Sequence, residues 1–554
     1  GPRNEMEALV AGVWQQVLGL ERVGIHDNFF DLGGHSLLAT QVMSRLRESF
    51  GIDIALRTVF DTPTVAALAD CITARTMQGA GVNTSPIVRV SREAPLPLSF
   101  EQQRLWFFDQ LMPRNPFYNV PVAYRITGRL NVEALEHSIN RIVERHEMLR
   151  TVFTMADGLP AQQVQPASPI DLNVVRIAAA DEVGREAEVE SLVRKEGQRP
   201  FDLSRGPLLR AILFEVTKSQ HVLVVTIHHI AADGWSMEVF LKELAALYEA
   251  RLHDEQPALP ELTVQYADYA VWQRQTLADA GVQQQLDYWN RQLADAPTSL
   301  NLPTDYSRPP AFSFRGAFER REIDEELFRD VEELCRQNGV TLFMTLLSAF
   351  AALLARYSGE KDILIGAPIA NRRRVEIERL IGFFTNTLVL RLDLSGNPPF
   401  RELLSRVREV SLAAYAHQDV PFEKLVEELH PERDMSRNPL FQVAFSLQNK
   451  SAQVLRLTDI AIEPSNVDIE TSKFDLCLYV CPSEWAATGW IGYNRDLFNP
   501  KTVEKMCRHF LRLLRSIAAR PDARLSELEL LLEEEKALLG RTSEIEDFAK
   551  SFSL

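Results

Sequence analysis

Two stretches of this 554-residue chain combine side chains that could do chemistry, and one of them holds two adjacent histidines. His228 and His229 end an apolar, β-branched run, and Asp233 and Gly234 follow within five residues. Because successive side chains of a strand point to opposite faces, one imidazole can enter a cavity while the other turns into the structure. Asp233 could accept a hydrogen bond from a histidine or form an ion pair with an arginine. Gly234 has no side chain and so leaves room for a ligand. Adjacent strand residues diverge, which disfavours a metal site.

The second stretch places Ser36 after two glycines and a histidine, at the start of an apolar-periodic segment. A lone serine at this place would be a helix N-cap. The segment is not a G-x-S-x-G elbow, so a hydrolase nucleophile is disfavoured. Alternatively, Ser36 carries a phosphate-linked group, because a helix N-terminus offers free N–H donors and the positive end of the helix dipole.

The elements around Ser36 form one small helical unit. Apolar residues recur at helical spacing and predict a first helix that starts at Asn4 and stops at Gly19. A later helix is predicted to start at Ser36, and residues 4–75 together read as an all-α bundle of four helices. Residues 76–95 lack periodicity and are rich in Gly, Ser, Pro and Asn, which is typical of a linker.

The remainder of the chain, from about 96 to 520, mixes helices and strands. The predicted elements include a core helix at 342–355 and strands at 221–230, 362–370 and 387–394. More than 400 residues are too many for one core, so we expect two lobes divided near 270–300. The tail from Pro521 is charged and is predicted to be helical.

Composition and charge narrow the function classes. With 46% hydrophobic and 25% charged residues, the chain has the composition of an ordinary globular protein. The formal net charge of −16 argues against nucleic acid or an anionic membrane as the main partner. Five scattered cysteines indicate free thiols in a reducing compartment, and we expect a cytoplasmic location. The chain opens with Gly1 rather than Met, and we expect a monomeric fragment of a longer protein.

The segment around Ser36 resembles a known family: it reads DNFFDLGGHSLLATQV from residue 27 onward. This motif, in a bundle of this size, is similar to the peptidyl carrier domain of a non-ribosomal peptide synthetase, and the resemblance covers residues 4–75. It implies that a phosphopantetheinyl transferase attaches 4'-phosphopantetheine covalently to Ser36. The thiol of that group would then carry the growing peptide as a thioester.

The segment around the two histidines, HHIAADGWS at 228–236, is similar to the HHxxxDG signature of the condensation domains of the same synthetases. Further motifs of these domains occur in order: SFEQQRLW at 99–106, RHEMLR at 145–150, YADY at 266–269, IGFFTNT at 381–387, HQDVPFE at 417–423 and RDMSRNPL at 433–440. Glu101, Ala232 and Thr385 depart from the usual residues of these motifs. Of the three, Glu101 is expected to alter the lining of the site.

The resemblance implies an α/β fold of two chloramphenicol-acetyltransferase-like lobes, in which a donor thioester and an acceptor amine meet at His229. His229 could position the amine, take its proton or stabilise the species that forms. Asp233 is expected to pair with an arginine across the lobes, and Arg372 is the candidate, with a solvated basic turn as the rival explanation. The expected site residues are His228, His229, Asp233 and Gly234, with Arg372, Trp235 and Asn386 as structural neighbours and no metal.

Two other activities share these features. An epimerisation domain would abstract the α-proton of the tethered residue instead, and a degenerate recruitment domain would only dock partners. A heterocyclisation domain would have DxxxxD in place of the paired histidines. The motifs at 381–387 and around 436–443 resemble condensation enzymes, which makes epimerisation the second choice. The segments at 98–111 and 228–236 look most like domains that join an L-configured donor to an L-configured acceptor.

The resemblance also implies an order of domains and a set of partners. The expected domains are a carrier at 4–75, a linker at 76–95, condensation lobes at 96–270 and 271–520, and the start of a linker to an adenylation domain at 521–554. The carrier would be the upstream donor. Its partners would be the upstream adenylation domain, the phosphopantetheinyl transferase and a downstream aminoacyl carrier as acceptor.

Overall fold

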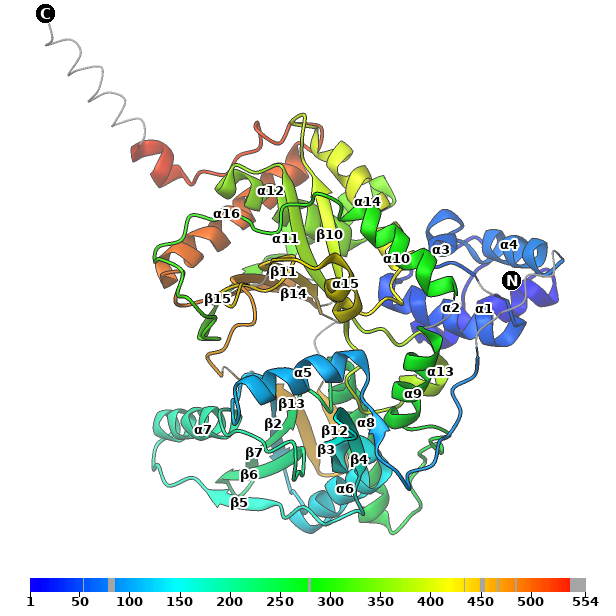
Figure 1. Ribbon diagram of the computed structural model, residues 1–554, viewed down its shortest axis with the longest axis vertical. Helices are drawn as coiled ribbons and strands as arrows, with labels where there is room; N and C mark the ends of the chain where they lie inside the picture. Colours follow the sequence, from blue (N-terminus) through cyan, green and yellow to red (C-terminus); the bar gives the residue numbers. More distant parts are fainter. Residues whose placement is uncertain are drawn as a thin grey trace, which may run out of the picture.

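Three bodies make up the structure, a computed structural model: a small helical bundle and two α/β lobes (Figure 1). The structure describes residues 1–52, 54–77, 85–277, 280–432, 434–448, 454–465, 467, 469–483 and 486–538. The bundle lies beside the C-terminal lobe, which is the upper one in Figure 1, and the N-terminal lobe lies below both. Arg433 of the motif at 433–440 lies outside the described residues.

The N-terminal bundle contains the helices α1 (Glu5–Leu18), α2 (Ser36–Phe50), α3 (Arg57–Asp61) and α4 (Val65–Met77). The Asn4 side chain caps α1 by accepting from the Glu7 N–H at 2.8 Å, and Gly19 ends the helix in the left-handed region, so both predicted ends are confirmed. Glu7 does not complete a capping box, because its carboxylate accepts from the Arg3 N–H at 2.6 Å. Trp14 and Phe29 pack edge to face in the buried centre.

The N-terminal lobe is built on a six-stranded sheet in the order β12-β13-β2-β7-β6-β5. Its strands are β2 (Asn119–Gly128), β5 (Asn173–Arg176), β6 (Leu209–Thr217), β7 (Gln220–His228), β12 (Leu455–Leu457) and β13 (Ile460–Ser465). The helices α6 (Val132–Arg145) and α8 (Gly234–His253) cover one face, and α7 (Glu182–Gly197) covers the other. Strand β7 is buried on both faces, which explains its continuous apolar sequence.

The C-terminal lobe holds a second six-stranded sheet, in the order β10-β9-β11-β14-β15-β8. Its strands are β8 (Gly316–Ile323), β9 (Asp362–Ile369), β10 (Asn386–Asp393), β11 (Val443–Leu447), β14 (Leu476–Pro482) and β15 (Ala487–Asn494). The helices packed in this lobe are α10 (Ala280–Gln292), α11 (Glu325–Asn338), α12 (Leu342–Ser358), α14 (Phe400–Ala416) and α16 (Pro500–Ala519). The predicted core helix and strands of this half therefore correspond to α12, β9 and β10.

Two segments of the second half of the chain return to the N-terminal lobe. Strand β13 pairs with β2, so β12 and β13 extend the N-terminal sheet. Residues 377–384 insert Ile377, Leu380, Ile381, Phe383 and Phe384 into the buried apolar cluster of the N-terminal lobe. A single division of the chain near 270–300 does not describe these crossings, because long-range packing decides them.

The linker and the tail differ in part from the sequence-based expectation. Residues 78–84 of the predicted linker lie outside the described part of the chain, and 85–95 pack on α9 (Tyr266–Thr276) without regular structure. The Trp272 indole N–H donates to the Ser85 carbonyl at 2.8 Å, and Arg92 pairs with Asp268 at 2.7 Å. In the tail, the prediction of helix from Pro521 is wrong for residues 521–532, and helix begins at 533.

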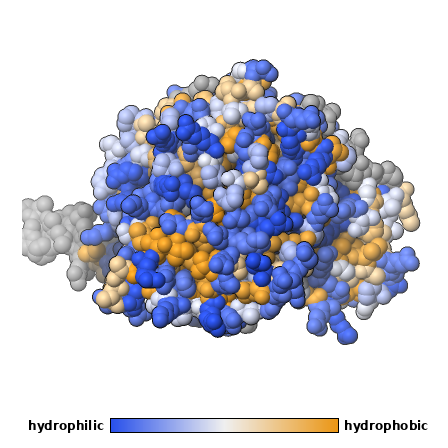
Figure 2. Space-filling model, turned by 90° about the horizontal axis from the view of Figure 1, so that it is seen from below, coloured by the Kyte–Doolittle hydropathy of each residue, from blue (hydrophilic) through white to orange (hydrophobic). Residues whose placement is uncertain are grey.

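Hydrophilic side chains cover most of the face seen in Figure 2, and hydrophobic ones gather in patches between them. Among the described residues, no single helix is long and apolar enough to cross a membrane. The pair α11 and α12 meets the length and composition requirement only together, with a bend of 106° between the two helices. Most of α12 is buried inside the C-terminal lobe.

Glu101 is buried between two helices of the N-terminal lobe, α5 (Phe100–Leu111) and α9, and is 1% exposed. Both of its carboxylate oxygens accept from the Gln273 amide, at 2.9 and 3.0 Å. Burial and, next, the charge of Glu423 raise the pKa of Glu101 to about 7. A carboxyl group whose pKa is raised by folding stabilises the protein below its unfolded pKa and loses that contribution as the pH rises towards 7.

We therefore expect Glu101→Gln to stabilise the protein at alkaline pH. At pH 8 the variant should gain about 1–3 kcal/mol relative to wild type, because it avoids a buried charge, and the gain should shrink towards pH 5. Chemical denaturation followed by tryptophan fluorescence at both pH values measures this difference. Glu133→Gln, on the exposed face of α6, is the control and should show no such trend. A gain that is the same at both pH values would contradict the assignment.

Candidate functional site

His229 follows the last residue of β7, and hydrogen bonds hold both its main chain and its ring. Its N–H donates to the Tyr118 carbonyl at 2.7 Å, and its ring Nδ1 lies 2.7 Å from the Ala232 carbonyl oxygen. The centre of the imidazole ring lies 4.6 Å from the centre of the Phe383 ring and 6.5 Å from that of the Tyr118 ring. Phe383 belongs to the crossing segment 377–384, so residues from both halves of the chain surround the imidazole.

These contacts determine the protonation state of His229. Burial and, next, the charge of Lys473 hold the pKa of His229 well below its ordinary value, so the ring is neutral at working pH. A carbonyl oxygen can only accept, so the single ring proton lies on Nδ1 and is donated to Ala232. Nε2 therefore carries a lone pair that can accept a proton or a hydrogen bond.

His228 faces the interior instead. It is 2% exposed, its Nδ1 accepts from the Ile230 N–H at 3.2 Å, and its ring packs edge to face on Phe201. Burial, then the charges of Lys473 and Arg210, lower the pKa of His228 to about 3. The alternation of side chains along β7 thus separates the two imidazoles, as strand geometry requires.

Lys473 provides the positive charge near both histidines. Its ammonium group lies 5.1 Å from the centre of the Tyr118 ring. Burial and, next, the charge of Arg104 lower the pKa of Lys473 to about 8. A cation at this place disfavours a second positive charge on the imidazole of His229.

Asp233 is a buried structural acceptor, 1% exposed, at the N-cap of α8. Its Oδ1 accepts from the Ser236 N–H at 2.8 Å and from the Ser236 hydroxyl at 2.7 Å. The same oxygen lies 3.0 Å from Arg372 Nη2, and Oδ2 accepts from the Phe384 N–H at 3.0 Å. With both oxygens occupied, the carboxylate fixes α8 against the crossing segment, and it is not free to act as a base.

Arg372 is 2% exposed and extends this network. Its Nη1 donates to the Ile377 and Leu380 carbonyls, each at 2.7 Å, and its guanidinium lies 4.1 Å from the Phe384 ring centre. Burial lowers the pKa of Arg372, and the charge of Asp233 opposes that shift. The solvated basic turn considered for this arginine does not match a side chain that is fully enclosed.

The other expected neighbours have different surroundings. The Trp235 indole N–H donates to the Glu378 carbonyl at 2.8 Å, beside Arg372. Gly234 is exposed, and a Cβ added to it would meet no atom within 4 Å, so neither conformation nor packing requires glycine there. The side-chain amide of Asn386 forms hydrogen bonds with the main chain of the turn 418–422 and so holds β10 against that turn.

Ser36 is the first residue of α2, and it faces the C-terminal lobe. Its hydroxyl oxygen is buried without a hydrogen-bond partner of good geometry, next to the hydroxyl of Tyr415 in α14. Burial raises the pKa of Tyr415 to about 12, and the neighbouring Ser36 hydroxyl opposes that shift. A helix N-terminus suits a phosphodiester because its first N–H groups have no intrahelical acceptor, but a group on Ser36 requires the bundle to move away from Tyr415.

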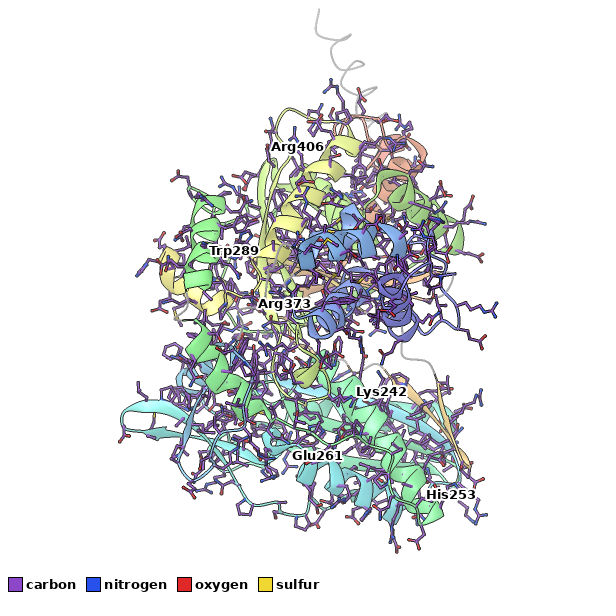
Figure 3. All side chains as sticks on the ribbon, turned by 90° about the vertical axis from the view of Figure 1, so that its right-hand side faces the viewer. Lys242, His253, Glu261, Trp289, Arg373 and Arg406 are labelled. Atoms are coloured by element: carbon purple, nitrogen blue, oxygen red, sulfur yellow. The ribbon has the colours of Figure 1, made fainter. Side chains whose placement is uncertain are left out.

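Polar contacts join the bundle to the C-terminal half of the chain. They are Ser44 Oγ to the Arg373 carbonyl (2.9 Å), Arg45 to Glu378 (3.3 Å), Arg57 to Glu409 (2.9 Å) and Arg408 to Asp61 (3.2 Å). Buried apolar residues of the two bodies form one continuous cluster. Figure 3 looks onto this side of the molecule and places Arg373 beside the bundle.

Sequence reasoning did not identify several groups of the site. Phe383 lies inside the recognised motif at 381–387, so that motif was a signal for it. Tyr118 and Lys473 carry no local signal, because both are distant from His229 in the sequence and only the fold brings them to it. The same holds for Tyr415 beside Ser36. The Ala232 carbonyl lies three residues after His229, in the turn that follows β7.

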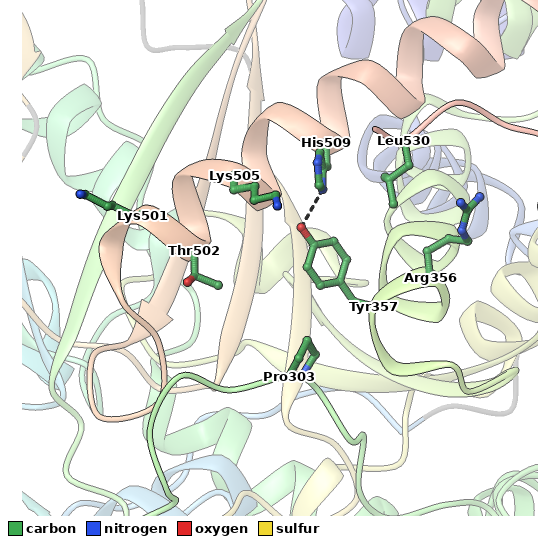
Figure 4. A pocket seen from close by; sticks show the side chains of 8 residues that line it. All are labelled: Pro303, Arg356, Tyr357, Lys501, Thr502, Lys505, His509 and Leu530. Atoms are coloured by element: carbon green, nitrogen blue, oxygen red, sulfur yellow. Dashed lines mark hydrogen bonds between the residues drawn. The ribbon is translucent and has the colours of Figure 1, made fainter. Parts of the chain in front are cut away.

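A cavity of about 560 Å³ opens elsewhere in the C-terminal lobe (Figure 4). It is lined by Pro303, Arg356, Tyr357, Lys501, Thr502, Lys505, His509 and Leu530. His509 bridges α12 to the tail, since its Nδ1 lies 2.8 Å from the Tyr357 hydroxyl and its Nε2 lies 2.7 Å from Glu535. None of the expected site residues lines this cavity, and no group of three or more His, Cys, Asp and Glu in the described ranges could hold a metal.

Asp233→Asn is predicted to destabilise the protein strongly. The substitution keeps the shape of the side chain but leaves the Arg372 guanidinium buried without its counter-charge, which costs about 3–5 kcal/mol. Thermal unfolding of both proteins measures the loss. Asp254→Asn, at the exposed C-terminal end of α8, is the matched control and should unfold like wild type. An Asp233→Asn variant with wild-type stability would refute the structural role of the pair.

Comparisons with known proteins agree with this geometry. A model described as "Condensation domain" matches residues 92–540, and one described as "Phosphopantetheine attachment site" matches 8–72. The linear gramicidin synthase of Brevibacillus parabrevis includes a subunit that is 48% identical over 97% of this chain, and malpibaldin synthetase of Mortierella alpina is 40% identical over 98%. The chain covers 10% of the length of each of these relatives.

A likeness to solved structures supports the same conclusion. The X-domain from teicoplanin biosynthesis is 31% identical, with a TM-score of 0.74, over 81% of this chain and 100% of that one. The predicted fold class, a carrier bundle before a two-lobed chloramphenicol-acetyltransferase-like domain, is confirmed. Because the condensation model matches well over half of its residues, this chain belongs to the condensation domains of the non-ribosomal peptide synthetases, with a phosphopantetheine carrier domain in front.

Proposed function

We propose that the chain is a peptide-bond-forming acyltransferase, in which the amine of an acceptor attacks a donor thioester at His229. The observation that carries this proposal is the free Nε2 lone pair of a neutral imidazole whose Nδ1 proton is engaged by the Ala232 carbonyl. Such a group can orient an amine by accepting its hydrogen bond. It can also take the proton that the amine must lose when the amide forms.

The reaction makes modest demands on a base. An α-amine has a pKa near 8, so a useful fraction is neutral at working pH. The amine nitrogen bonds to the carbonyl carbon, the carbon–sulfur bond breaks, and the leaving thiolate must be protonated. The proton released by the amine can pass through Nε2 to that sulfur, which balances the reaction without any further reactant.

The surroundings of His229 favour two of its three possible roles. Neutral Nε2 has no proton, so it cannot donate to a developing oxyanion at the start of the reaction. The charge of Lys473 opposes a long-lived imidazolium. We infer that His229 positions the amine and passes its proton on, rather than stabilising the oxyanion.

The carrier domain would supply the donor. When bound to Ser36, phosphopantetheine supplies a thiol that holds the peptide as a thioester. We propose that an upstream adenylation domain loads this carrier, that a phosphopantetheinyl transferase modifies Ser36, and that a downstream aminoacyl carrier brings the acceptor. We propose domains at 4–75, 96–270 and 271–520, with β12, β13 and residues 377–384 of the last range packed on the N-terminal lobe. The five cysteines form no disulfide, which suits a cytoplasmic setting.

A second candidate function is recruitment of another protein. The teicoplanin X-domain is also described in a complex with OxyB, and it resembles this chain at 31% identity. His229 is neutral, and both carboxylate oxygens of Asp233 are already hydrogen-bonded. These two features favour catalysis over docking alone. Epimerisation is less favoured, because the matching family model and relatives are those of condensation domains and peptide synthetases.

The variant Gly234→Ala tests whether substrate uses the open space at residue 234. Its melting temperature shows separately whether the fold requires glycine there. A Cβ at residue 234 meets no protein atom within 4 Å, so the melting temperature should stay close to that of wild type. If substrate passes there, the added methyl group should lower kcat/KM for condensation about tenfold or more. Unchanged kinetics would show that the open space at Gly234 is not used.

His229→Ala tests the catalytic assignment directly. Ser36 is loaded with a peptidyl-phosphopantetheine, a separate aminoacyl carrier is added, and intact-protein mass spectrometry follows the extended peptide on the acceptor. We expect wild type to transfer the peptide and the variant to be slower by about 10²-fold or more, the usual range for loss of an acid–base group.

One control variant and two alternative outcomes make this result interpretable. His137→Ala, on the exposed face of α6, should transfer like wild type. Stable loading of wild type without transfer to several aminoacyl carriers would favour recruitment. A change of configuration of the loaded residue without a change of mass, seen by chiral analysis, would favour epimerisation. Near-normal single-turnover rates of His229→Ala would refute its role.

A further inference from the structure

One residue of the condensation domain, Glu378, contacts the carrier and the paired-histidine motif at the same time. It ends the one-turn helix α13 (Val375–Glu378), which lies next to α2 of the carrier (Figure 1). Its carboxylate Oε2 lies 3.3 Å from Arg45 Nη2 of α2. Its main-chain carbonyl accepts from the indole N–H of Trp235, at 2.8 Å.

Of the ion pairs named above for this interface, Arg45–Glu378 has the most buried side chains. The Glu378 and Arg45 side chains are 10% and 22% exposed, whereas those of Arg57 and Glu409 are 47% and 54% exposed. Burial raises the pKa of Glu378, and the charge of Arg45 opposes that shift. A buried carboxylate that loses its counter-charge is strongly disfavoured, so this face selects a carrier with a cation at residue 45.

The pair also holds unused hydrogen-bonding capacity. Arg45 Nη1 and Glu378 Oε1 are both buried, and neither has a hydrogen-bond partner. Arginine and a carboxylate can form two parallel hydrogen bonds, so a small shift of the carrier would convert this single contact into a two-pronged one. The buried Ser36 hydroxyl likewise requires the carrier to move before it can carry a group.

The other contacts of α13 lead to the catalytic motif. The Ile377 and Leu380 carbonyls, on either side of Glu378, accept from Arg372. Arg372 in turn pairs with Asp233, which lies four residues after His229. A movement of Glu378 therefore moves the acceptors that hold Trp235 and Arg372, and with them the loop that follows His229.

We propose that α13 is a docking relay: seating of Arg45 of the donor carrier on Glu378 positions the motif that carries His229. Arg45 and Glu378 are then positioning residues, and the partner that this face fits is a carrier whose second helix presents a cation. The inference rests on the proposed donor role of the carrier. It adds that donor docking and the geometry of the motif are coupled, so each favours the other.

The test uses charge reversal in the full chain. Arg45→Glu and Glu378→Arg each place like charges together, and the double variant restores an opposite pair in reversed order. Two quantities are measured: the NMR resonance of the Trp235 indole N–H, assigned with Trp235→Phe, and kcat for transfer from the loaded Ser36. Arg22→Glu, an exposed charge reversal elsewhere on the carrier, is the matched control.

We expect Arg45→Glu and Glu378→Arg each to shift the Trp235 resonance and to lower kcat at least tenfold. The double variant should recover both to within about threefold of wild type, and Arg22→Glu should change neither. An unmoved Trp235 resonance in Arg45→Glu would overturn the relay, leaving a contact that only docks. Failure of the folded double variant to recover either quantity would overturn it as well. If wild type transfers nothing, the proposed function fails, but the resonance still decides the relay.

Discussion

The buried ion pair between Asp233 and Arg372 is the interaction on which the architecture of the site depends. Two charges that are 1% and 2% exposed are stable only together, so the helix that follows the histidines and the segment that crosses from the other half of the chain must meet at one place. Ser236 and the Phe384 N–H occupy the remaining positions of the carboxylate. The pair thus joins two parts of the chain that are 139 residues apart in sequence.

This constraint sets the chemistry available at His229. The crossing segment brings the Phe383 ring to the imidazole, and the turn after β7 brings the Ala232 carbonyl to Nδ1. The outcome is a neutral ring with a defined tautomer and an accepting Nε2. A neutral, oriented acceptor suits attack by an amine that is already partly deprotonated on an activated acyl group, for which a strong base is unnecessary.

The crossing segment also meets the carrier, so one stretch of chain faces both the carrier and the motif that holds His229. Arg373 and Glu378 contact α2 within six residues of Arg372. The carrier interface combines a continuous apolar cluster with a few ion pairs, most of them partly exposed, which individually stabilise little. Such an interface suits a domain that must dock, deliver and leave.

The local features of this protein follow from short stretches of its sequence. Helical periodicity and the Asn4 and Gly19 caps delimit the first helix, the glycines before Ser36 place it at a helix start, and the apolar run of β7 places His228 and His229 at a strand end. Three features depend on the packing of the whole chain: which arginine meets Asp233, which lobe β13 joins, and the meeting of Arg45 with Glu378, 333 residues away. The physical reason is range: periodicity, caps and turns act over a few residues. The pairing of buried charges depends on how whole lobes pack, and no local pattern encodes that.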